Sequence, residues 1–154
     1  MWELSVVSRV LHVSTAIVLV GGVFFMRFIL MPAASRTLSE AQHVALREAV
    51  LAGWKRVVHA GITLMLASGL FNYLRVIFEK THKGDGLYHG LLGFKILVAL
   101  VIFFISSALV GRSAGLQRFR DNSRFWLGVN LLLALLIVAI SGFLKIRGIV
   151  GAGS

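Results

Sequence analysis

The chain has 154 residues, of which 58% are hydrophobic and only 14% are charged, and it contains no cysteine. Soluble domains have about 25% charged residues, so the composition excludes an ordinary soluble domain. The lack of cysteine excludes disulfides, thiolate metal sites and thiol catalysis. The net charge of +10 lies mostly in the short loops between apolar segments, where it suits anionic lipid headgroups. We therefore expect a lipid bilayer, and no nucleic acid, as the partner.

Four apolar segments are long enough to cross a membrane, which takes about 20 residues in helical conformation. They cover residues 4–31, 54–78, 87–111 and 125–146. The first lacks the basic start of a signal peptide and is too long for one, so we interpret it as a retained span. The sequence predicts an all-α, four-helix transmembrane bundle that forms a single integral membrane domain over residues 1–154.

The loops between the spans differ in character. In the first loop, Ser39 and Gln42 have the spacing of a capping box, and an apolar stripe follows. This pattern predicts a short interfacial helix that runs into Trp54. The second loop, 79–86, is polar, and the third, 112–124, is basic. Because basic residues near span ends favour the cytoplasm, the excess in the first and third loops predicts that both termini lie outside it.

Ionisable residues inside a span are costly, and each is a functional candidate. His12 and Lys95 each lie about eight residues into a span, and both spans run in the same direction. At about 1.5 Å per residue, the two side chains lie about 12 Å deep from the same face. The other candidates are Arg9 and His89, nearer to that face, and Arg27, His59 and Asn130, in the opposite half.

The four spans contain no acidic residue. Arg9, Arg27 and Lys95 therefore have no protein counter-ion at their depth. A lipid phosphate, a bound anion or, for Lys95, loss of the proton must balance the charge. A haem or another porphyrin would supply two propionates, and its iron would give His12 a role as axial ligand. In the alternative reading, the arginines snorkel to headgroups, and His59 and His89 are interfacial.

Nearly the whole sequence resembles the bacterial HemJ-type protoporphyrinogen oxidases. The similar stretches are residues 11–12 (LH) and 21–28 (GGVFFMRF) in the first span, 55–56 (KR) and 68–70 (SGL) in the second, 94–97 (FKIL) and 111–112 (GR) in the third, and 125–145, with Asn130 and Lys145, in the fourth. The copper-resistance protein D membrane domain belongs to the same superfamily. Residues 30–33 (LMPA) and 94–97 suit that branch equally well.

The resemblance implies a haem b protein of the bacterial inner membrane. In the HemJ-type enzymes the histidine of the first span and the lysine of the third are associated with haem binding and activity, and they correspond to His12 and Lys95. His12 would be the metal ligand, and Lys95 a second ligand or a propionate partner. Further cofactor contacts would come from Arg9, Arg27, His89 and Asn130. The chain departs from the family pattern in three places. Ser106-Ser107 stand where the family has a histidine, and Ile146 replaces the proline that follows the family's lysine, here Lys145. After Asn130, the acid and the proline of the family are missing.

The leading hypothesis is a haem-binding membrane redox protein that transfers electrons or oxidises a small hydrophobic substrate, such as a porphyrinogen, with a quinone as acceptor. One alternative is copper handling, for which the four methionines form no motif. Another is a non-catalytic accessory or assembly subunit of a larger membrane complex, and a homo-oligomer fits the sequence as well. His12 and His59 form an alternative ligand pair, although their depths differ by about 10 Å.

Overall fold

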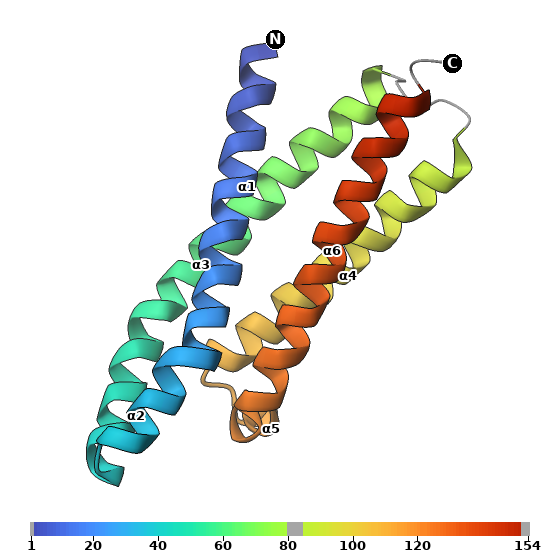
Figure 1. Cartoon of the computed structure of the whole chain (residues 1–154). Coiled ribbons are helices and arrows are strands. Elements are labelled where there is room, and N and C mark those ends of the chain that lie inside the picture. Colours follow the sequence, from blue (N-terminus) through green and yellow to red (C-terminus); the bar gives the residue numbers. More distant parts are fainter. Residues whose placement is uncertain (1, 80–84, 152–154) are drawn as a thin grey trace.

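The computed structural model describes residues 2–79 and 85–151, and nearly all of them are helical (Figure 1). The elements in chain order are α1 (Trp2–Phe25), the π-helical turn η1 (Met26–Leu30), α2 (Met31–Thr37), α3 (Glu40–Glu79), α4 (Gly86–Val110), the 3-10 turn η2 (Ala114–Leu116), α5 (Gln117–Asp121) and α6 (Ser123–Gly151). The predicted all-α bundle is confirmed. Most of the polar second loop, residues 80–84, lies outside the described residues.

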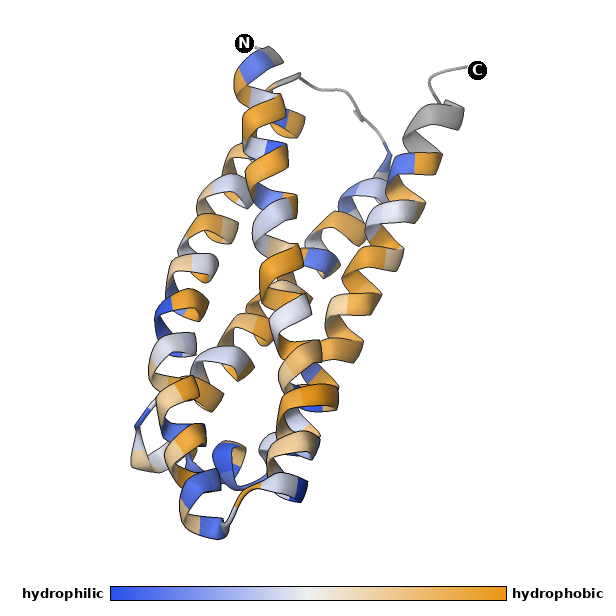
Figure 2. Cartoon of the chain, turned by 60° about the vertical axis from the view of Figure 1, so that its left-hand side comes forward, coloured by the Kyte–Doolittle hydropathy of each residue, from blue (hydrophilic) through white to orange (hydrophobic). Residues whose placement is uncertain are grey.

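Four helical stretches are long and apolar enough to span a bilayer: Glu3–Thr37, Glu40–Phe78, Gly86–Val110 and Ser123–Ile146. Hydrophobic residues dominate their middle parts (Figure 2). Many large apolar side chains point outward, and Leu132, for example, is 68% exposed. Such surfaces are unfavourable in water and normal in lipid, where helices satisfy their own backbone hydrogen bonds. The chain is a multi-pass membrane protein.

The four long helices pack as two pairs. α1 lies along α3, α4 lies along α6, and the contact between α3 and α4 joins the pairs, whereas α1 and α6 touch much less. α1 begins and α6 ends at the same end of the bundle (Figure 1), which we call the terminal end. The opposite end, which carries α2 and α5, is called the α2 end. Because α1 and α6 make little contact, the side of the bundle between these two helices is the least closed.

The first span contains a π-helical turn, η1, directly before the single proline of the chain. Pro32 has no backbone N–H, and its ring disturbs the preceding turn of a regular α-helix. A π-turn places an extra residue in the helix and changes its register. The chain therefore remains helical through Pro32 and into α2, so the first helical stretch continues to Thr37 and does not end at Met31 as predicted.

The predicted capping box is present at the start of α3. The Ser39 backbone N–H donates to Gln42 Oε1 at 3.1 Å, and the Gln42 N–H donates to Ser39 Oγ at 3.4 Å. The apolar stripe that follows is not a separate interfacial helix, because α3 is continuous over 40 residues. Gly53 weakens the helix where the predicted interfacial helix joins the second span, but a single glycine costs a helix only about 1 kcal/mol. The predicted short helix is thus the first part of α3.

Arg120 organises the basic third loop. Its guanidinium donates to the Gly111 carbonyl at 3.2 Å and to the Ser113 carbonyl at 2.8 Å, which satisfies acceptors just after α4. Arg47 on α3 donates to the Arg120 carbonyl at 3.3 Å. These bonds hold the loop between α4 and α6 against α3 and close the α2 end of the bundle.

Candidate functional site

The polar contacts between helices fall at two levels, one toward each end of the bundle. Toward the terminal end, His12 of α1 meets Ser68 of α3, with 2.8 Å between Nδ1 and Oγ. Ser68 is buried and His12 is half-buried. One turn from His12 toward the terminal end, Ser8 donates to Asn72 Oδ1 at 3.4 Å. These bonds link α1 to α3 in the half where the sequence predicted a functional layer.

The hydrogen bonds of Ser68 favour one tautomer of His12. Ser68 Oγ lies 2.6 Å from the Leu64 carbonyl oxygen, which can only accept, so the single hydroxyl proton points to that carbonyl. Ser68 Oγ therefore accepts from His12, and Nδ1 of the imidazole carries the hydrogen. In the neutral ring, Nε2 then has a free lone pair. A histidine held in this way is oriented to bind a metal through Nε2.

Gly69 lies against the imidazole of His12. A Cβ atom at Gly69 would stand 3.4 Å from His12 Cε1 and 3.9 Å from Nδ1. A methyl group at this position would therefore be in van der Waals contact with the ring. Glycine here allows α3 to approach α1 closely, as small residues do in membrane bundles.

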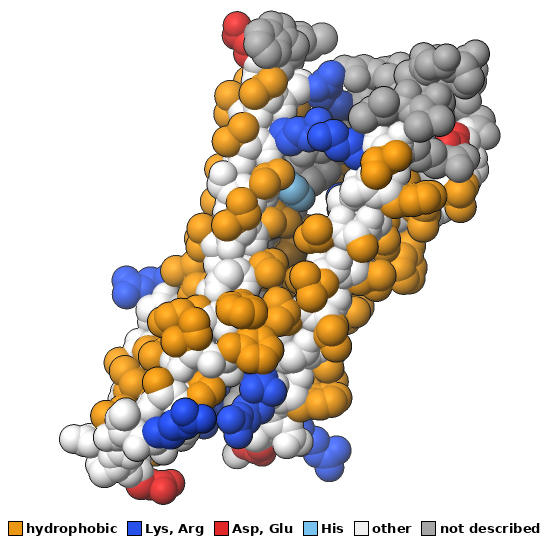
Figure 3. Space-filling view, viewed as in Figure 1, with side chains coloured by type: hydrophobic (Ala, Val, Ile, Leu, Met, Phe, Trp, Pro, Cys, Tyr) orange, Lys and Arg blue, Asp and Glu red, His pale blue; other side chains and the backbone are white. Residues whose placement is uncertain are grey.

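Three basic side chains share this region. Lys95 of α4 is half-buried, and its charge acts on His12, while the charge of Arg9, one turn before His12 on α1, acts on Lys95. Figure 3 shows Lys and Arg side chains gathered between the upper parts of α1 and α6, with a histidine below them in a hollow of the surface. Like charges that act on one another in this way favour an anion between them. We call His12, Ser68, Lys95 and Arg9 the His12 cluster.

The other candidate residues lie elsewhere. Arg27 is 15 residues beyond His12 on one continuous helix, about 22 Å away, with its guanidinium 5.3 Å from the Phe28 ring centre. His59 is exposed and donates from Nδ1 to the Lys55 carbonyl at 2.7 Å. His89 is exposed on the first turn of α4, beside the Tyr88 ring. Of these three, only His89 shares the terminal half with the His12 cluster.

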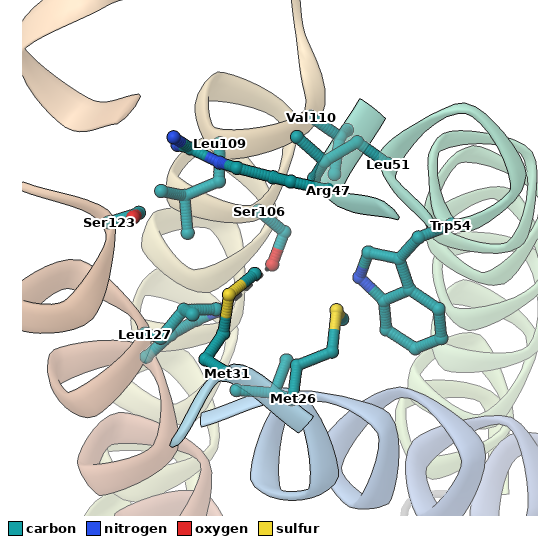
Figure 4. A pocket seen from close by; sticks show the side chains of 12 residues that line it. Met26, Met31, Arg47, Leu51, Trp54, Ser106, Leu109, Val110, Ser123 and Leu127 are labelled. Carbon is teal, nitrogen blue, oxygen red and sulfur yellow. Dashed lines mark hydrogen bonds between the residues drawn. The ribbon is translucent and has the colours of Figure 1, made fainter. Parts of the chain in front are cut away.

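Asn130 occupies the second polar level, toward the α2 end. Its Nδ2 donates to Ser106 Oγ on α4 at 2.8 Å. It is one of 12 residues that line a small open cavity of about 40 Å³ (Figure 4): Val23, Met26, Met31, Arg47, Leu51, Trp54, Ser106, Leu109, Val110, Ser123, Leu127 and Asn130. Met26 lines the same cavity and lies 14 residues beyond His12, about 21 Å along the helix, so Asn130 is remote from the His12 cluster.

Sequence reasoning missed two parts of these sites. Ser68 belongs to the stretch 68–70 (SGL), but nothing in the sequence identifies it as the direct partner of His12. The cavity was not predicted, although the sequence contained a signal for it. Ser106 lies four residues before the end of α4, and Asn130 lies seven residues after the start of α6. Two antiparallel helices bring such positions to one level, so paired polar residues in adjacent spans could have indicated the contact.

Within the described ranges, no three His, Asp or Glu side chains are placed to share a metal ion. An iron porphyrin takes only one or two axial ligands from the protein. Comparison of the chain with protein-family models, with curated proteins and with solved structures gave no match.

Proposed function

We propose that the bundle binds haem b at the His12 cluster and serves as a membrane redox protein. The observation that carries the proposal is the His12–Ser68 hydrogen bond, which leaves Nε2 of the imidazole free to act as axial ligand. Orientation of a ligating imidazole through its second nitrogen is common at metal sites.

The charges of the His12 cluster support the same ligand. Haem carries two propionates, and the cations that would receive them are Lys95, whose charge acts on His12, and Arg9, whose charge acts on Lys95. The four spans supply no carboxylate of their own for these cations. Lys95 would act as a propionate partner or as the second axial ligand. The loosely packed side between α1 and α6 would admit a flat macrocycle from the lipid.

Haem bound here would supply one-electron chemistry, and the protein would control its ligation and surroundings. Ser68 would hold the imidazole, Lys95 and Arg9 would neutralise the propionates, and the apolar helix faces would exclude water. Electron transfer is the function these residues support best. Oxidation of a porphyrinogen, with a quinone as acceptor, follows from the resemblance to the HemJ-type enzymes. We place both termini on the non-cytoplasmic side of a bacterial inner membrane, following the basic loops.

A titration with two porphyrins tests the ligation directly. The purified protein should bind haem stoichiometrically with a sharpened Soret band, and it should bind metal-free protoporphyrin more weakly, because both have propionates but only haem has iron for His12. Equal affinity for the two would mean that iron ligation contributes nothing. Failure of both to bind would contradict the proposal as a whole.

Ser68→Ala should weaken haem binding about 10- to 100-fold, the usual effect of removing the partner of a ligating histidine. The imidazole would lose its acceptor at Nδ1 and become free to rotate. The matched control is Ser141→Ala, because the Ser141 hydroxyl makes only the same kind of intrahelical bond, to the Ile137 carbonyl at 2.7 Å. Haem titrations of both variants check this, and an equal loss in the control would show a general effect of serine removal.

A further inference from the structure

Arg27 is a cation that the His12 cluster does not account for. It lies in η1, about 22 Å along the helix from His12, which is too far for one ligand to reach both. Its side chain is half-buried, and its Nε atom is buried without a hydrogen-bond partner among the described residues. Arg27 forms no ion pair within the described ranges, and the sequence has no acid between Glu3 and Glu40. Its charge therefore needs an anion from outside the chain.

Arg27 lies near the level of the lipid headgroups. It follows Glu3 by 24 residues, about 36 Å of helix, which slightly exceeds the hydrocarbon thickness of about 30 Å. The turn η1 packs against α6, and Met26 lines the same cavity as Ser123, the first residue of α6. Trp126 follows in the first turn of α6, and tryptophan is enriched at the membrane–water interface. Arg27 is thus level with the point where the fourth span enters the membrane.

The aromatic rings beside Arg27 face the lipid. Its Cζ atom lies 5.3 Å from the centre of the Phe28 ring, and the rings of Phe28 and Phe24 are 4.9 Å apart. Both phenylalanines are about half exposed, so they belong to the surface that acyl chains touch. Figure 3 shows Lys and Arg side chains at the α2 end, next to a band of apolar side chains. The ligand that fits such a boundary carries an anion and an apolar tail.

A phosphate is the anion that suits a guanidinium, because it can accept two parallel N–H···O bonds. Since Nε is buried, the two terminal nitrogens of Arg27 would make these bonds. Residues 27–56 and 112–124, which belong to the α2 half, contain nine Lys and Arg but only three Asp and Glu. The ammonium group of a zwitterionic lipid would be unfavourable there. We propose that Arg27 binds the phosphodiester of an anionic phospholipid, whose acyl chains lie along Phe24 and Phe28.

Native mass spectrometry of the haem-free wild-type protein in a neutral detergent tests the choice of lipid. The chain should retain one molecule of phosphatidylglycerol, and it should bind phosphatidylcholine with the same acyl chains about fivefold more weakly or less. Equal retention of the two lipids would overturn the preference for an anionic headgroup. Inorganic phosphate at the concentration of the lipid should not displace phosphatidylglycerol. Displacement would show a site for a free anion and would also overturn the proposal.

Arg27→Gln removes the charge and should lower the affinity for phosphatidylglycerol about tenfold or more, because bonds to a charged group are lost. The matched control is Arg36→Gln, which removes the same charge from the same helical stretch. Arg36 lies nine residues further, about 14 Å, and the Debye length is about 10 Å in about 0.1 M salt, so its loss should change the affinity less than about twofold. An equal loss in both variants would mean that the lipid responds only to net charge, and would overturn the proposal.

Arg27→Lys covers the case in which the glutamine variant does not fold, because it keeps the positive charge. A lysine cannot form the paired bonds of a guanidinium, so the affinity should fall about threefold or more. Unchanged affinity would overturn the role given to the guanidinium. His12→Ala should bind the lipid as the wild type does, so the result does not depend on haem. Loss of lipid binding in His12→Ala would place the lipid at the His12 cluster and contradict the proposal.

Discussion

His12→Ala should abolish haem binding, and His59→Ala should leave it intact. Both residues are histidines of membrane helices whose Nδ1 is hydrogen-bonded, but their surroundings differ. His12 meets Ser68 of the neighbouring helix and lies in the field of Lys95. His59 is bonded to the Lys55 carbonyl of its own helix and is exposed. Absorbance titration of each purified variant with haem measures the difference.

The pair of variants also distinguishes ligation from general hydrophobic uptake of haem by a membrane protein. A haem that merely partitions into the bundle or its detergent would respond equally to both substitutions. Retention of an unchanged Soret band in His12→Ala would therefore contradict the role of His12. Loss in His59→Ala alone would instead favour a site on α3 that the contacts around His12 do not explain.

Gly22→Val should destabilise the bundle, whereas Gly21→Val should have almost no effect. A Cβ atom at Gly22 would overlap the indole ring of Trp54, while a Cβ at Gly21 meets nothing within 4 Å. Overpacking of this kind costs about 1–3 kcal/mol, and an isolated surface change usually stays within about 0.5 kcal/mol. Because both residues are glycines of the same helix turn, helix propensity cancels between them. Thermal unfolding in detergent gives the comparison.

A double variant tests the mechanism of this destabilisation. Trp54→Ala removes the ring that Gly22 accommodates, so the cost of Gly22→Val should be smaller in that background than in the wild type. Such non-additivity is expected for residues in contact. An equal cost in both backgrounds would mean that the valine clashes with something other than Trp54, and that the close approach of α1 and α3 has a different origin.

Hydrophobic length alone was sufficient to predict the four membrane helices, because the bilayer requires about 20 apolar residues for each. The capping box at Ser39 and Gln42 was also predictable, since it depends on local spacing. The continuity of α3 could not be predicted, because the sequence around Gly53 permits both a break and an unbroken helix. Tertiary packing decides between the two. The π-turn before Pro32 depends in the same way on how the helix accommodates the ring.

The rise per residue of a helix predicts that His12 and Lys95 lie at one level, and in the structure the charge of Lys95 acts on His12. The partners of His12 could not be predicted in this way. Which side chain of α3 meets His12 depends on the rotation of both helices about their axes. Apolar residues suit both the lipid and the interior of the bundle, so the apolar character of the spans does not fix that rotation. Ser68 could therefore be identified as the partner only from the packed structure.

The optical spectrum of the wild-type protein, purified after expression with ample haem, tests the central claim most directly. Haem ligated by His12 should give a Soret band and, on reduction, the α band of a b-type cytochrome. If the protein is purified without colour, and haem added to it keeps the spectrum of free haem, the claim that the bundle binds haem through His12 is contradicted.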